Sequence, residues 1–229
     1  MEILIKQIIV VTDGKSNVGG NPADAAFLAF KKGIRVSSIG IVDDGNLSIK
    51  EIKDIASYGG GVYDIVYSDD FIRSLSAVTQ KSAEKTLYDT LDAELMKLIG
   101  KSIEGLHPVL RSQIVDYIDK LLDVSDIKCA ILLDLSGSMA RKLKKAVNGI
   151  NDLLSTMKGR KGKSEFCLIG FPGGDNVYAK VICPFTSRIN DIEAYLKSLK
   201  VGGNTPTYYA IKMATSFFET EVESIRGIG

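Results

Sequence analysis

Five oxygen-bearing side chains stand where apolar runs give way to loops: Asp13, Asp134, Ser136, Ser138 and Thr205. Two of the apolar runs, at residues 8–11 and 129–133, end directly before such a loop. Open α/β sheets bind their ligands at the carboxyl ends of the parallel strands, which form one edge of the sheet. We therefore expect the five side chains to converge at this carboxyl edge. Carboxylate and hydroxyl oxygens suit hard cations, which predicts a site for Mg²⁺ or Mn²⁺.

The elements that must position these residues follow from the hydrophobic pattern. Six short apolar runs predict strands at residues 6–11, 34–42, 62–67, 127–133, 165–171 and 177–183. The last run follows a glycine-rich turn, which predicts an antiparallel edge strand. Helical spacing of apolar residues lies between most of the other runs. This alternation is typical of right-handed β-α-β units and a mostly parallel sheet.

One segment, at about residues 82–123, breaks the alternation. Its leucines and isoleucines recur at helical spacing in two stretches, separated by the turn from Gly100 to Pro108. The pattern predicts two amphipathic helices that form a hairpin, separate from the helix expected at residues 69–78.

The residues Asp134-Leu-Ser136-Gly-Ser138, Thr205 after two glycines, and Thr12-Asp13-Gly14 resemble the metal-ion-dependent adhesion site of von Willebrand factor A (VWA) domains. In that family the aspartate element comes last, whereas here it comes first. The resemblance therefore implies an α/β fold, with a three-layer, doubly wound, mostly parallel sheet that is circularly permuted. Residues 1–81 would form its C-terminal half, 82–126 a helical linker, and 127–229 its N-terminal half, together making one domain.

The resemblance also implies roles for the five residues. Ser136 and Ser138 would coordinate the ion through their hydroxyls, and Thr205 directly or through water. Asp134 and Asp13 would act largely through water and as acceptors that orient the hydroxyls. A shell of neutral hydroxyls leaves the ion strongly positive. An Asp or Glu carboxylate of a partner protein is then expected to complete the coordination, without any reaction.

The composition limits the classes of partner. Hydrophobic residues make up 45% of the chain, which indicates a well-buried globular core. The net charge is only +1, so no overall electrostatic field attracts the chain to nucleic acid or to an anionic membrane. No apolar run is long enough to span a bilayer, and the N-terminus does not have the pattern of a signal peptide. The three cysteines lie in apolar runs without metal-binding spacing. A cytoplasmic protein is expected.

Two other functions remain open. A metal-dependent hydrolase or phosphatase would use the same loops, but the second aspartate typical of haloacid dehalogenases is replaced by Ser136. The single histidine, His107, lies in the predicted inter-helix turn, so a serine-hydrolase triad is not expected. We therefore expect no enzyme. The second alternative is a structural or assembly protein whose metal site is vestigial.

The resemblance extends to two groups with intracellular partners. Small cytoplasmic VWA proteins of endospore-forming Firmicutes share the permuted order, which implies a sporulation-related partner. The stretch from Gly202 to Thr207 is similar to VWA subunits that work with AAA+ ATPases. A monomer is expected, because the linker is long enough for one chain to close on itself. A dimer that exchanges halves is the alternative.

Overall fold

The computed structural model describes residues 3–42, 48–67, 70–174, 176–196 and 199–226. Its centre is a sheet of six strands in the order β3-β2-β1-β4-β5-β6. Five strands are parallel and β6 is antiparallel to β5. The strands are β1 (Leu4–Thr12), β2 (Arg35–Val42), β3 (Gly60–Tyr67), β4 (Asp126–Asp134), β5 (Ser164–Phe171) and β6 (Lys180–Thr186).

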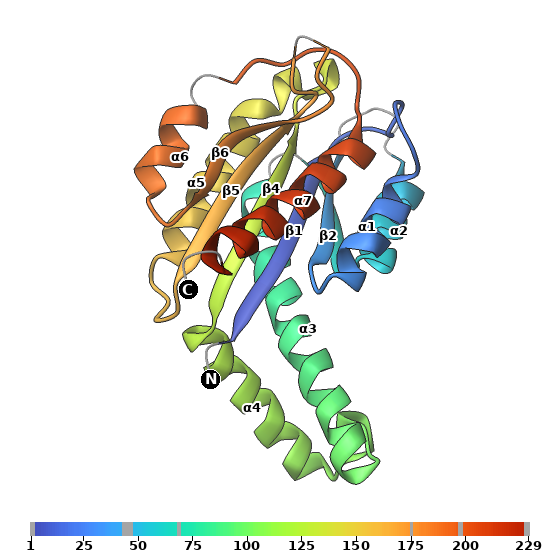
Figure 1. Ribbon diagram of the computed structural model, residues 1–229, viewed down its shortest axis with the longest axis vertical. Coiled ribbons are helices and arrows are strands. Elements are labelled where there is room, and N and C mark those ends of the chain that lie inside the picture. The colour runs from blue at the N-terminus through green and yellow to red at the C-terminus, as the bar shows by residue number, and fades with distance from the viewer. Residues whose placement is uncertain (1–2, 43–47, 68–69, 175, 197–198, 227–229) are drawn as a thin grey trace.

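Helices cover both faces of this sheet (Figure 1). One face carries α1 (Pro22–Lys31), α2 (Ile49–Tyr58) and α7 (Thr207–Arg226). The other carries α3 (Phe71–Ile99), α5 (Leu143–Met157) and α6 (Ile189–Leu196). Alternate side chains of β1 face the two layers, with Ile9 in one apolar core and Ile8 in the other. The predicted three-layer α/β fold is confirmed.

Helix α3 differs from the sequence prediction, because it is one continuous helix of 29 residues. The expected break near residues 79–82 does not occur. No glycine or proline interrupts this stretch, and the helix ends at Gly100, whose φ of 66° is left-handed. Its middle is also held on the sheet, since Ser37 Oγ on β2 donates to Ser82 Oγ at 3.0 Å. The helical segment therefore begins inside the packed domain.

Arg35 on β2 adds a second anchor for α3. Its guanidinium donates to Thr86 Oγ1 and to Asp89 Oδ2, both at 2.8 Å. Beyond this point α3 and α4 (Pro108–Val124) leave the sheet and project as a hairpin (Figure 1). A short 3₁₀ turn, η1 (Ile103–Gly105), lies at its tip. The predicted hairpin is confirmed, and several of its apolar side chains are exposed: Met96, Leu98, Ile99, Val109, Leu110, Val115 and Tyr117.

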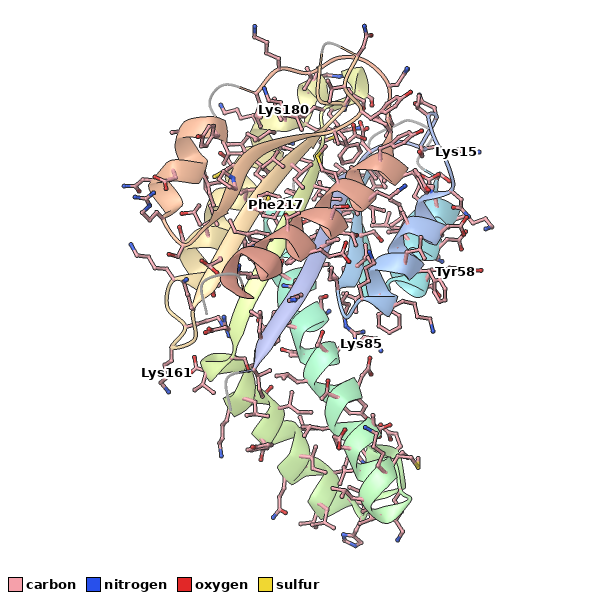
Figure 2. The ribbon with its side chains drawn as sticks, viewed as in Figure 1. Lys15, Tyr58, Lys85, Lys161, Lys180 and Phe217 are labelled. Atoms are coloured by element: carbon pink, nitrogen blue, oxygen red, sulfur yellow. The ribbon has the colours of Figure 1, made fainter. Side chains whose placement is uncertain are left out.

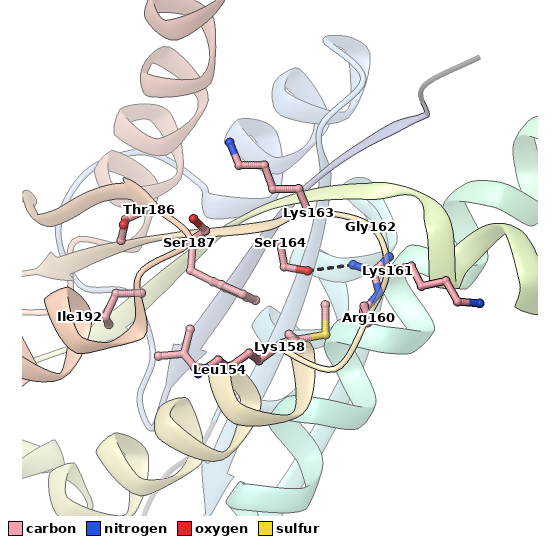
Figure 3. A pocket seen from close by; sticks show the side chains of 12 residues that line it. Leu154, Lys158, Arg160, Lys161, Gly162, Lys163, Ser164, Thr186, Ser187 and Ile192 are labelled. Atoms are coloured by element: carbon pink, nitrogen blue, oxygen red, sulfur yellow. Dashed lines mark hydrogen bonds between the residues drawn. The ribbon is translucent and has the colours of Figure 1, made fainter.

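The basic loop after α5 contacts the base of this hairpin, and Figure 3 shows the bond between its Arg160 and Ser164. Arg160 donates to the carbonyls of Leu122 and Ser125 at the end of α4, and to Ser164 Oγ at 2.8 Å. Lys161 pairs with Asp123 at 2.9 Å. The loop lies at the edge of the sheet opposite Lys15 and Lys180 (Figure 2). The charged side chains of this loop therefore hold the end of α4 against the start of β5.

The edge strand β6 also differs in position from the prediction, because it begins at Lys180 rather than near residue 177. Val177 instead pairs with Gly174 in an isolated bridge that closes the turn after β5. The turn between β5 and β6 is therefore longer than the tight turn that its glycines predicted. Asp175 lies outside the described residues.

Candidate metal centre

The register of β1 and β4 brings the first two polar residues together. Val11 lies opposite Leu133 in the parallel pairing, so Thr12 and Asp134 meet at the carboxyl edge. Thr12 Oγ1 donates to Asp134 Oδ2 at 2.5 Å, and the backbone N–H of Ser136 donates to Asp134 Oδ1 at 2.8 Å. Both carboxylate oxygens are therefore held in a fixed orientation.

Asp134 is completely buried. Burial raises the pKa of this carboxyl to about 6, although the hydrogen bonds from Thr12 and Ser136 oppose the shift. The carboxylate is thus costly to keep ionised without a cation nearby. A bound divalent ion would lower that cost.

The serine loop extends the arrangement toward solvent. Ser136 caps the short 3₁₀ helix η2 (Gly137–Arg141) and is buried, whereas Ser138 is exposed. The two hydroxyl oxygens lie 3.0 Å apart. Ser138 Oγ donates to Asp13 Oδ1 at 2.7 Å, which joins residues that are 125 positions apart in the chain.

A lysine that the sequence did not single out completes the cluster. Lys142 Nζ donates to Asp13 Oδ2 at 2.6 Å, and neither side chain is more than 9% exposed. Lys142 follows η2 and precedes α5, so the turn after the serine loop carries its side chain to Asp13. In sequence it belongs to the basic run Arg141–Lys145, which has no signal of burial.

Thr205 is placed at the same edge through its backbone. Its N–H donates to Asn17 Oδ1 at 2.8 Å, and its carbonyl accepts from Ser16 Oγ at 3.1 Å. The loop before it is tied to the serine loop, because Gly202 N–H donates to Leu135 O at 2.8 Å. Among the described residues, the Thr205 hydroxyl takes no part in the hydrogen bonds of Asp13, Asp134, Ser136 and Ser138.

The donor set fits a small, hard divalent ion. Serine hydroxyls and aspartate carboxylates converge at one point. In the part of the chain that the structure describes, no group of three or more His, Cys, Asp or Glu side chains offers a softer or more acidic site. We therefore take Asp13, Asp134, Ser136, Ser138 and Thr205 as the candidate metal centre, with Lys142 as the neighbouring cation.

The parallel sheet, its two helical layers and the serine loop at the carboxyl edge define a class of protein. The sequence model of the von Willebrand factor type A domain matches residues 129–227. A relative from Bacillus subtilis extends the likeness over almost the whole chain. The chain belongs to the von Willebrand factor type A family.

Two bacterial proteins, both described as uncharacterized, are similar to this chain over almost its whole length. YabS of Bacillus subtilis (strain 168) is 33% identical, over 98% of this chain and 93% of its own length. A crystal structure of a protein from Alicyclobacillus acidocaldarius is also 33% identical, with a TM-score of 0.90 over 97% of both chains. The predicted membership of the VWA family is confirmed, and so is the predicted likeness to small proteins of Bacillus and related bacteria.

Domains of this family commonly hold a divalent metal ion at the serine loop. The circular permutation stays a prediction. None of the described helices is both long and apolar enough to cross a lipid bilayer.

Proposed function

We propose that this protein is a metal-dependent protein-binding module whose Mg²⁺ or Mn²⁺ ion takes a carboxylate from a partner protein. The hydrogen bond between Ser138 and Asp13 carries the proposal, because it assembles the loops of two distant segments into one centre. The exposure of Ser138 makes this centre accessible from solvent.

The charge balance supports capture of a carboxylate. Ser136 and Ser138 are neutral donors, and Lys142 already offsets the charge of Asp13. An ion held here keeps much of its positive character and offers an open coordination position. An Asp or Glu side chain is the protein group that best satisfies such a position.

A non-catalytic role is part of the proposal. All four oxygens of Asp13 and Asp134 accept hydrogen bonds from Thr12, Ser136, Ser138 and Lys142, so we propose that the two carboxylates hold these groups in place. His107 lies at the start of α4 on the projecting hairpin, where its Nδ1 accepts from Val109 N–H at 3.4 Å. A phosphatase and esterase screen with Asp134→Asn as control tests the enzyme alternative.

Calorimetry tests metal binding directly. Mg²⁺ and Mn²⁺ should bind wild type, and binding should be lost in Asp13→Asn and weakened at least tenfold in Ser138→Ala. Ser155→Ala is the matched control, because Ser155 is an exposed serine on α5 that bonds only to the Asn151 carbonyl in its own helix. Wild type that binds neither ion, with or without an added carboxylate peptide, would establish a vestigial site.

One chain can supply the whole centre, so we propose a monomer with permuted order. β1 lies directly beside β4, which is where a permuted chain must join its two halves. Mixing Asp13→Asn with Ser138→Ala after unfolding and refolding tests this. A dimer that exchanges halves would regenerate one intact metal centre in each mixed pair, whereas monomers would not recover binding.

The identity of the partner stays a prediction. An AAA+ ATPase and a sporulation-related protein both fit the proposed centre if they present an accessible carboxylate. Nucleic acid and membrane are not proposed as partners, because the net charge of +1 provides no general attraction to either.

A further inference from the structure

Two neighbouring depressions lie at the carboxyl edge of the sheet. The first has a cavity volume of about 540 Å³ and the second about 490 Å³. Pro172, Gly174 and Lys200 line both, so the two depressions share a border at the turn after β5, and we call the pair the edge groove. Two adjoining depressions offer more room than a single side chain fills, which suits an extended segment of polypeptide.

The edge groove adjoins the metal centre on both sides of its loops. Asn204 and Pro206, the neighbours of Thr205, line the first depression. Leu135, which lies between Asp134 and Ser136, lines the second. A partner segment whose carboxylate reaches the metal centre therefore has the groove within reach of its flanking residues.

The charged side chains among the described residues of the edge groove are lysines. Lys180 and Lys200 are exposed at its wall, and no acidic residue is among the described residues that line it. Neither lysine has an ion pair within the described part of the chain. Figure 2 shows Lys180 at the same end of the molecule as Lys15, which follows the Asp13 loop.

A stacked aromatic ring, that of Tyr178, forms one wall of the first depression. Tyr178 lines the first depression and is 49% exposed. Its ring stacks on Tyr209 of α7 with centroids 4.2 Å apart, and Tyr208 meets Tyr209 edge-on at 5.3 Å. Stacked rings lose little conformational freedom on binding, so they offer apolar contact at low entropic cost.

We propose that the edge groove binds a short, extended, acidic segment of the partner protein, with one carboxylate at the metal centre and at least one more beside Lys200 and Lys180. This inference rests on the proposed function, and it adds that the partner is recognised by a cluster of acidic residues. The shared border with the metal centre, where we propose that an Asp or Glu side chain binds, favours a peptide over other polyanions.

Fluorescence anisotropy with three labelled decapeptides tests the inference. All have a Gly-Ser background, and they contain no acidic residue, one central Asp, or the central Asp with two Glu on each side. In saturating Mg²⁺, wild type should bind the multiply acidic peptide roughly threefold to tenfold more tightly than the single-Asp peptide. Lys180→Gln/Lys200→Gln should abolish that gain and leave Mg²⁺ affinity unchanged.

Lys101→Gln is the control, because Lys101 is an exposed lysine in the hairpin turn, away from the sheet. An unchanged preference for the multiply acidic peptide in the double lysine variant would overturn the inference, as would equally tight binding of an oligonucleotide with the same charge. Lysine-dependent binding that persists in EDTA would separate the groove from the metal centre and also overturn it. Failure of wild type to bind Mg²⁺ in calorimetry would instead refute the proposed function.

Discussion

Lys142 Nζ and Asp13 Oδ2 form an ion pair of 2.6 Å inside the metal centre, on the carboxylate oxygen opposite the one that accepts from Ser138. The pair is almost fully buried. It neutralises Asp13 in the absence of a divalent ion, and it places a fixed positive charge beside the position that the ion would occupy. We therefore expect the proposed metal affinity and the stability of the metal-free protein to depend on the same contact.

Replacing this lysine should move the two properties in opposite directions. Lys142→Met keeps the length of the side chain but leaves Asp13 as a buried, unpaired carboxylate, which should lower the free energy of unfolding in EDTA by about 3 kcal/mol. Mg²⁺ affinity should rise roughly tenfold, because a competing cation is removed. Urea unfolding and calorimetry measure the two effects. Lys144→Met, an exposed neighbour on α5, is the control, and an unchanged Mg²⁺ affinity in Lys142→Met would contradict the argument.

Asp134 predicts a pH dependence of the metal-free protein. Its pKa is raised from 3.8 to about 6 by burial, so the folded state binds a proton at a higher pH than the unfolded state does. The contribution of this group to stability therefore increases as pH falls from about 6 to about 4, and is lost as pH rises through 6. Urea unfolding in EDTA across this range should show the effect as a difference between wild type and Asp134→Asn. Parallel pH profiles for the two proteins would exclude it.

Replacing Gly149 on α5 by alanine should have the opposite effect on stability to the one that helix propensity predicts. A Cβ at this position would lie 2.6 Å from a ring carbon of Phe71, the fully buried first residue of α3. Alanine normally stabilises a helix interior relative to glycine by about 1 kcal/mol. Here Gly149→Ala should destabilise the protein by about 1–3 kcal/mol, because the two helices must separate. Thermal unfolding measures this, and restored stability in Gly149→Ala/Phe71→Leu would attribute it to the ring.

Arg160 should control the base of the hairpin. Its guanidinium reaches two carbonyls at the end of α4 and one hydroxyl on β5, a set that a single ammonium does not match. Arg160→Lys should therefore raise amide hydrogen exchange in the last turn of α4, with little change in Mg²⁺ affinity. Lys158→Arg, in the same loop, is the control. Unaltered exchange in Arg160→Lys would show that packing alone holds α4.

The sequence predicted the parts of the fold that depend on local pattern. Apolar runs that end in a loop gave β1 and β4 within about two residues, and with them the edge where Asp13 and Asp134 meet. Ser136 and Ser138 follow β4, and their hydroxyls lie together as expected, while the ligand role that the resemblance implied stays a prediction.

The features that were missed depend on contacts between distant segments. Lys142 resembles any solvated lysine until the turn after the serine loop brings it to Asp13. The continuity of α3 depends on Ser37 and Arg35 of β2, which hold residues that the helical spacing alone assigned to a linker. Spacing within a segment carries no information about such partners.

The uninterrupted α3 has a mechanical consequence. As a rod of 29 residues it extends for roughly 43 Å, from the contact of Phe71 with Gly149 to the tip of the projecting hairpin. α5, which carries Gly149, begins directly after Lys142. Because Ser37 and Arg35 of β2 hold the middle of α3, its packed half fixes the direction in which the hairpin projects from the sheet.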